Sequence, residues 1–127
     1  MVSCGSVVEQ EDAQASNENL DSLLLAHPDS VPLLVKRGEL KFKEYEYDLA
    51  LQDAAKAYRL DKKNKAAKLL FAEVINNRPQ RTPDEVATAQ VLYKELIKLD
   101  KKNTRALVGL ASTYSFQRDF EKSFDSK

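Results

Sequence analysis

The residues of this chain that could perform covalent or metal chemistry are few and isolated. The one histidine, His27, precedes a proline, and the one cysteine, Cys4, lies in a polar N-terminal segment. A zinc site needs several nitrogen or sulfur ligands, and a catalytic cysteine needs a base and an orienting group. Neither set can be assembled from nearby residues. His27 is therefore interpreted as a surface turn residue, and Cys4 as a tail thiol or, alternatively, a lipidation site.

Sequence motifs for phosphate binding and acid–base catalysis are also missing. The chain has no glycine-rich phosphate loop, no nucleophile elbow and no run of metal-ligand residues. The acidic pairs Glu44/Glu46 and Asp84/Glu85 fall at predicted helix ends, where they are interpreted as solvent charges. We therefore expect a protein that is not an enzyme and that uses no cofactor or metal.

The charge balance and hydropathy narrow the class further. Basic and acidic residues each number 20 among 127 residues, so the formal net charge is zero. A general nucleic-acid binder usually has a basic excess, so that function is disfavoured. Nucleic-acid binding through a local basic patch stays as an alternative, and that patch would consist of Lys62, Lys63, Lys101, Lys102 and Arg105. No apolar run approaches the roughly 20 residues that span a bilayer, and no secretory signal opens the chain. We expect an intracellular protein, cytoplasmic or nuclear, without a membrane span.

Apolar residues recur at the helical spacing of three and four after residue 20. The residue before a proline leaves the helical region, so the first helix is predicted to end near Ala26. Ser30 and Asn64 are suited to cap the helices that follow them. Thr82 and Glu85 flank a proline in a capping-box pattern, which predicts another helix start.

The pentapeptide LDKKN occurs twice, at 60–64 and 99–103, each time between two predicted helices. Its lysines follow a helix end, where cations are favourable, and its asparagine can cap the next helix. We interpret LDKKN as a recurring turn between repeats. A basic ligand patch is the alternative.

The segment 31–64 is 34 residues long and resembles a tetratricopeptide repeat. Leu34 and Gly38 stand at the large and small sites of its first helix, and YDLAL at 47–51 is similar to the family's YDEAL, with Ala50 at the small site. Arg37 and Lys41 depart from the family by replacing apolar or aromatic residues. A second unit, 65–103, fits if five extra residues are placed near 76–82. That insertion is either a binding loop or merely tolerated length.

A third, partial unit begins at 104, and its second helix is expected to start at RDFEKSF, residues 118–124. The resemblance, which covers about residues 20–127, implies an all-α fold, a right-handed α-solenoid of helix-turn-helix repeats. The predicted organisation is a flexible acidic tail at 1–15 and an array at 16–127. Within the array, 16–30 is the closing helix of a partial unit, followed by repeats at 31–64 and 65–103 and a partial repeat at 104–127.

The resemblance also implies a function, protein–protein interaction as an adaptor or scaffold. The first helix of each pair would line a concave groove that holds a peptide or helix of a partner. Carried over by position, that groove is lined by Val35, Glu39, Phe42, Lys43, Leu69, Glu73, Asn76, Arg105, Val108 and Ser112.

Two further expectations concern partners. Co-chaperones of this family bind a C-terminal carboxylate with lysine, asparagine and arginine; the matching positions here are Val35, Glu39, Leu70, Arg105 and Gly109. Only one of these has the right character, so a carboxylate clamp for chaperones is not expected. The alternative function is a structural subunit that assembles or self-associates through its terminal helices, because Phe120 and Phe124 lack a covering helix.

Overall fold

The computed structural model describes residues 17–125 as helices joined by short turns, without a strand in that range. The all-α class predicted from the sequence is therefore confirmed for these residues. The predicted tail at 1–15, with Cys4, lies outside them, as does the side chain of Phe124. The helices are α2 (Asn17–Ala26), α3 (Val31–Lys43), α4 (Tyr47–Leu60), α5 (Lys65–Asn77), α6 (Pro83–Leu99) and α7 (Thr104–Asp125).

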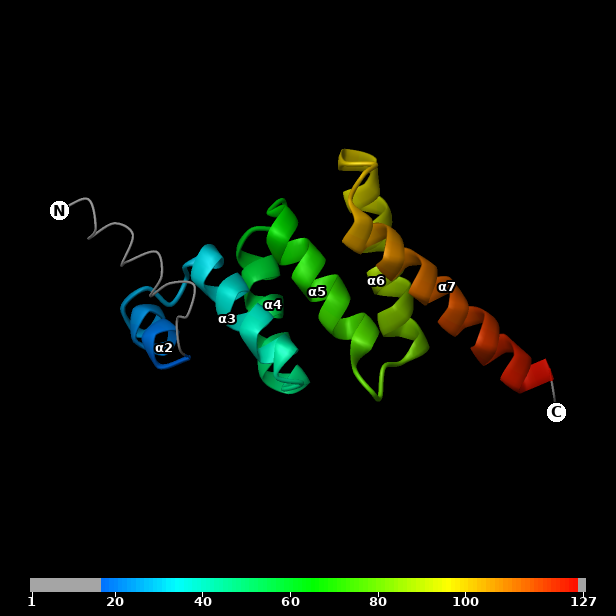
Figure 1. The fold of residues 1–127 in the computed structure, drawn as a ribbon, viewed down its shortest axis with the longest axis horizontal. Coiled ribbons are helices and arrows are strands. Elements are labelled where there is room, and N and C mark those ends of the chain that lie inside the picture. The colour runs from blue at the N-terminus through cyan, green and yellow to red at the C-terminus, as the bar shows by residue number, and fades with distance from the viewer. Residues whose placement is uncertain (1–16, 126–127) are drawn as a thin grey trace.

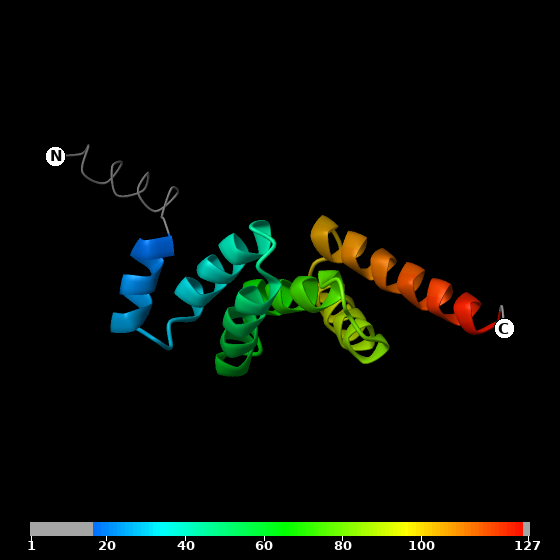
Figure 2. The same ribbon diagram turned by 90° about the horizontal axis from the view of Figure 1, so that it is seen from below.

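The helices form an elongated row, with α2 at one end and α7 at the other (Figure 1). Each helix packs against the next in the chain, and α3 also packs against α5 and α5 against α7. Seen from below, α4 and α6 project to one side of the row formed by α3, α5 and α7 (Figure 2). The odd-numbered helices α3, α5 and α7 therefore share one face of the molecule.

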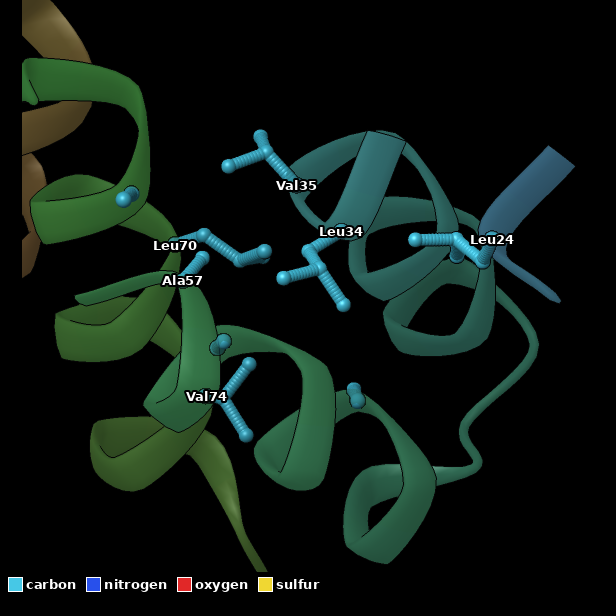
Figure 3. Close-up of a cluster of buried hydrophobic side chains, with 9 residues drawn as sticks. Leu24, Leu34, Val35, Ala57, Leu70 and Val74 are labelled. Carbon is cyan, nitrogen blue, oxygen red and sulfur yellow. The ribbon is translucent and has the colours of Figure 1, made fainter. Parts of the chain in front are cut away.

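Two hydrophobic clusters hold the row together. The first cluster joins the four helices α2, α3, α4 and α5 through residues such as Leu24, Leu34 and Leu70 (Figure 3). The second joins α5, α6 and α7 around Tyr93 and Leu96, which are 0% and 1% exposed. Full burial of one such side chain contributes about 1.5–3 kcal/mol. No helix here could bury its apolar stripe without its neighbours.

Both copies of LDKKN form the same turn. Asp61 and Asp100 follow the helix ends, and each carboxylate accepts the backbone N–H of the second lysine of its turn, at 3.2 and 3.0 Å. Asn64 then accepts the N–H of Ala67 at 3.0 Å, and Asn103 that of Ala106 at 3.1 Å. The prediction of a recurring inter-helix turn with an asparagine cap is confirmed.

Two of the other predicted helix boundaries are confirmed in full, and the third is confirmed only in position. Helix α2 ends at Ala26, as expected. Thr82 accepts the N–H of Glu85 at 3.2 Å and donates its own N–H to the Glu85 carboxylate at 3.0 Å, which confirms the capping box. Ser30 occupies the N-cap position of α3, but its side chain makes no capping hydrogen bond.

The predicted helix start at 118 is wrong, because α7 continues without interruption from Thr104 to Asp125. No glycine or proline lies between 110 and 125 to break it. Just before the expected break, Gln90 of α6 donates to the Gln117 side chain at 3.0 Å. Beyond it, Phe116 and Phe120 stack one turn apart, with ring centroids 6.0 Å apart. Side-chain contacts of α7, one with α6 and one within the helix, therefore lie on both sides of Arg118.

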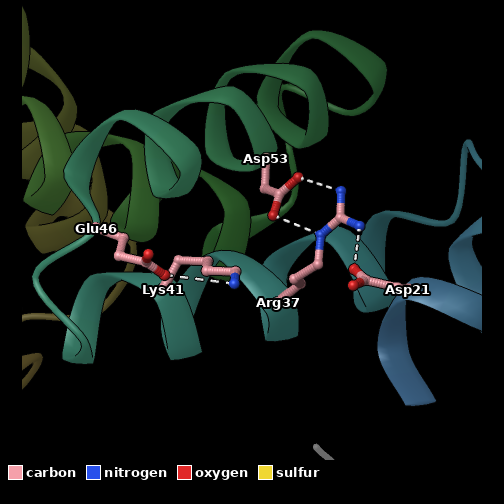
Figure 4. Close-up of polar contacts among 5 residues, drawn as sticks. All are labelled: Asp21, Arg37, Lys41, Glu46 and Asp53. Carbon is pink, nitrogen blue, oxygen red and sulfur yellow. Dashed lines mark hydrogen bonds and ion pairs between the residues drawn. The ribbon is translucent and has the colours of Figure 1, made fainter. Parts of the chain in front are cut away.

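Arg37, one of the two residues that depart from the repeat pattern which the sequence resembles, joins three helices (Figure 4). Its guanidinium donates to both carboxylate oxygens of Asp53 on α4, at 2.8 and 2.7 Å, and to Asp21 on α2 at 2.7 Å. Hydrogen bonding to Asp53 raises the pKa of Arg37, while burial acts the other way. Lys41, the second departure, pairs with Glu46 at 3.4 Å.

The turn between α3 and α4 has an unusual backbone at Tyr45. Its φ of 63° lies in the left-handed region, and it is the one non-glycine residue in the described range with positive φ. The geometry lets Glu46 donate its N–H to the Lys41 carbonyl at 2.9 Å, which satisfies a helix-end carbonyl. A side chain in this region costs about 1–2 kcal/mol, so glycine would be the easier residue. The Tyr45 side chain is nevertheless 77% exposed and gains little burial in return.

Candidate functional site

The face shared by α3, α5 and α7 contains an open cavity of about 420 Å³, which we call the concave cavity. Apolar contacts come from Phe42 and from Val108, which is 64% exposed. The full lining comprises Phe42, Glu73, Asn76, Asn77, Tyr93, Thr104, Arg105, Val108, Gly109 and Ser112.

Six of the ten residues predicted from the sequence to form a groove line this cavity: Phe42, Glu73, Asn76, Arg105, Val108 and Ser112. They come from three helices and span 70 positions of the chain. Their shared location follows from the packing of α5 against both α3 and α7.

The other four predicted residues lie elsewhere. Val35 is 7% exposed in the first hydrophobic cluster, and Leu69 is 9% exposed in the second. Glu39 and Lys43 are on α3 outside the lining, half-buried and exposed respectively. The negative charge of Glu39 contributes to raising the pKa of Arg105, so this carboxylate is near the cavity even though it does not line it.

Arg105 is bound by an acidic neighbour. Its Nε donates to one carboxylate oxygen of Glu73 at 3.1 Å, and its second guanidinium nitrogen donates to the other oxygen. This pair connects α7 to α5, and Glu73 raises the pKa of Arg105. The Arg105 charge is therefore offset within the cavity wall.

Tyr93 also lines this cavity, although it is not among the groove residues predicted from the sequence. The side chain is fully buried, and its hydroxyl has no hydrogen-bond partner. The ring passes directly under Gly109 of α7, where an added Cβ would lie 2.2 Å from the ring carbon Cζ. Burial raises the pKa of the Tyr93 hydroxyl, and the charge of Glu73 adds to the effect, while Asn76 opposes it. The hydroxyl is therefore neutral at ordinary pH and is buried beneath the cavity surface.

Asn76 has a structural task as well as a place in the lining. It is 1% exposed, and its backbone carbonyl accepts a hydrogen bond from Arg81. The Arg81 guanidinium also lies 4.7 Å from the centre of the Phe116 ring. Through its backbone carbonyl Asn76 anchors the loop between α5 and α6, a contact that a substitution of its side chain would keep.

A different surface, which we call the lysine face, lies on α6 away from the concave cavity. Val91, 55% exposed, and Ile97 form its apolar part. Lys94, Lys98 and Lys101 surround them, and the hollow measures about 690 Å³. Glu95 also lines the face but is paired with Lys68 of α5 at 3.0 Å.

Comparisons with known proteins do not assign this chain to a group. No protein-family model matches it, and no curated protein sequence matches it. Within residues 17–125, no helix has both the length and the apolar character to cross a membrane. In the same range there is no group of three or more histidine, cysteine, aspartate or glutamate side chains that could hold a metal ion.

Proposed function

We propose that the chain is a repeat protein of the tetratricopeptide type, a right-handed α-solenoid, that binds a peptide or helical segment of another protein in the concave cavity. The order of helix packing supports this, because each helix contacts the next and α3, α5 and α7 also contact in series. The close contacts at Gly38 and Ala50 support it too. A Cβ at Gly38 would lie 2.7 Å from the Leu70 side chain, and Ala50 is fully buried.

The observation that carries the binding proposal is the gathering of six predicted groove residues around one cavity. Phe42 and Val108 provide apolar anchor points, and the paired Glu73 and Arg105 provide a polar wall. Interfaces that bind peptides combine a few buried apolar contacts with polar groups that fix orientation. The exposed fraction of Val108, 64%, leaves this anchor available.

The charges indicate what kind of segment fits. A terminal carboxylate would meet Glu73 and Glu39, and Arg105, the arginine of the cavity lining, already pairs with Glu73. An internal segment with an apolar side chain avoids that repulsion.

The test is to compare two exposed valines. Val108→Asp introduces a charge into the concave cavity, and Val91→Asp introduces the same charge on the lysine face. Both variants should remain helical by circular dichroism, because neither valine is buried. Each is immobilised and used for affinity capture from a cell extract with quantitative mass spectrometry. A protein captured by the wild type and by Val91→Asp, but lost from Val108→Asp, supports the proposal. Equal capture by all three contradicts it.

A second candidate function is that of a structural subunit that assembles through its C-terminal end. The observation favouring it is the lysine face together with the exposed aromatic residues of α7, Tyr114 at 48% and Phe120 at 39% exposure. This function predicts self-association at high protein concentration that Val91→Asp or Phe120→Asp abolishes and Val108→Asp leaves intact. Sedimentation equilibrium measures it, and a monomer at all concentrations argues against self-assembly.

A further inference from the structure

A second cavity of about 420 Å³, which we call the turn cavity, lies between the α3–α4 turn and the α5–α6 loop. It combines two features that the concave cavity does not use. One is the left-handed Tyr45, and the other is residues 78–80, part of the extra length around 76–82 that the repeat pattern left unexplained. The lining is Tyr45, Glu46, Tyr47, Asp48, Leu49, Arg78, Pro79 and Gln80.

The turn cavity has an aromatic wall. The rings of Tyr45 and Tyr47 meet edge to face, with centroids 6.4 Å apart and an interplanar angle of 61°. Tyr47 in turn contacts Phe42 at 5.8 Å, and Leu49 is 43% exposed beside them. The fold does not require a tyrosine at 45, because glycine suits a left-handed turn better. A side chain kept in a strained, exposed position points to a function for that side chain.

The charge at the turn cavity is negative. Asp48 has no ion pair among the described residues, and Glu46 is only partly offset by Lys41 at 3.4 Å. Arg78 also lines the cavity, but its guanidinium is paired with Glu85. With Glu46 and Arg78 each in an ion pair, the carboxylate of Asp48 remains as one negative charge, which exceeds the roughly half positive charge at the N-terminus of α4. The positive end of α4 explains why an acidic residue is favourable at position 48, but it does not explain the exposed Tyr45.

We propose that the turn cavity binds an arginine side chain of a partner peptide. The guanidinium stacks on the Tyr45 ring and pairs with the carboxylates of Asp48 and Glu46. A planar cation suits this arrangement because it can stack on an aromatic face and donate several hydrogen bonds at its edge. This site is separate from the concave cavity, although the contact between Phe42 and Tyr47 makes the two cavities neighbours.

The experiment is an NMR titration of the isotope-labelled full chain at low salt. The probe is the capped peptide Gly-Ser-Arg-Arg-Ser-Gly, and the control replaces both arginines with citrulline, which has the same shape without the charge. We expect the amide signals of Tyr45, Asp48 and Gln80 to shift with the arginine peptide only. Absence of such shifts, or equal shifts with citrulline, overturns the proposal.

Two variants at Tyr45 separate binding from folding. Tyr45→Phe keeps the ring and should keep the affinity for the arginine peptide. Tyr45→Gly removes the ring and should weaken binding about two- to fivefold, the size of an exposed cation–π contact. The same variant should unfold at a higher temperature than the wild type, because glycine relieves the left-handed backbone. Unchanged affinity in Tyr45→Gly overturns the aromatic part of the proposal.

Asp48→Asn tests the electrostatic part without touching the turn. The change preserves the size of the side chain and removes its charge. We expect weaker binding of the arginine peptide and a shallower dependence of affinity on salt, since one charge pair is lost. Binding by Asp48→Asn that equals the wild type at every salt concentration contradicts an arginine site at this place.

Discussion

The α3–α4 turn and the middle of α7 share two local sequence features but have different structures. The first is Lys43-Glu44-Tyr45-Glu46-Tyr47, and the second, 116–120, reads FQRDF. Neither contains glycine, and each has an acidic residue before its second aromatic residue. The chain reverses direction at Tyr45, but it continues as a helix through Arg118.

The difference teaches that packing, and not local preference alone, decides that the chain turns at Tyr45 and continues as a helix at Arg118. A left-handed residue costs about 1–2 kcal/mol, so the turn at Tyr45 needs compensation. Helix α4 provides it, because Ala50, Ala54 and Ala57 are fully buried and Asp53 binds Arg37 of α3. After Arg118 the corresponding burial is small, with Phe120 still 39% exposed. Continuing the helix is then the conformation of lower free energy.

The largest expected effect comes from the ion pair that fastens α4 onto α3. Asp53 is 5% exposed and holds the Arg37 guanidinium with two hydrogen bonds. Asp53→Ala should lower the free energy of unfolding by about 2–3 kcal/mol, because it leaves a half-buried cation short of its main partner. Urea denaturation measures the change. Asp21→Ala, at a more exposed partner of the same arginine, is the control and should cost less than 1 kcal/mol. Equal losses in both variants would show that the pair is not what secures the turn.

The next effect concerns the close contact of α7 with α6. A Cβ at Gly109 would meet three atoms of the buried Tyr93 ring, the nearest at 2.2 Å. Gly109→Ala should destabilise the chain by about 1–3 kcal/mol, because either the buried ring or helix α7 has to shift to make room for the methyl group. Gly38→Ala in α3, whose nearest contact is the end of a leucine side chain, should cost less. Thermal unfolding of the two variants ranks them, and a reversed order would contradict the packing described here.

Glycine at the two compared positions should have opposite effects. Tyr45→Gly should stabilise the chain by about 1 kcal/mol, because it relieves the left-handed backbone. Arg118→Gly should destabilise it by about 1 kcal/mol, because glycine is unfavourable inside a helix. Denaturation monitored by circular dichroism measures both. Stabilisation by Arg118→Gly would mean that the chain does turn there.

The smallest effect is at the Tyr93 hydroxyl. Because this group has no partner, Tyr93→Phe should change stability at neutral pH by less than about 1 kcal/mol. Burial raises the folded-state pKa of Tyr93, so its contribution to stability is present at neutral pH and is lost as the pH rises above about 10. The wild type should therefore lose more stability than Tyr93→Phe between neutral and strongly alkaline pH. Parallel urea curves would exclude an ionisable buried hydroxyl.

Much of the helix layout could be predicted because it depends on local chemistry. The end of α2 before proline, the caps at Asn64 and Thr82 and both LDKKN turns all depend on residues within four positions of one another. The residues of the site were harder to predict. Val35 and Leu69, expected in the groove, are buried because of the angles at which the helices cross. The unpaired hydroxyl of Tyr93 and the three-helix pairing of Arg37 depend on residues 16 or more positions away. No local pattern marks such contacts.

The most direct test of the binding proposal is site-specific photocrosslinking from the two exposed valines. A photoreactive amino acid at position 108 probes the concave cavity, and the same group at position 91 probes the lysine face. Both positions are more than half exposed, at 64% and 55%, so the chain should fold with either label. The account predicts a crosslinked partner from position 108 and none from position 91. A crosslink from position 91 alone would contradict it and place the partner on the lysine face.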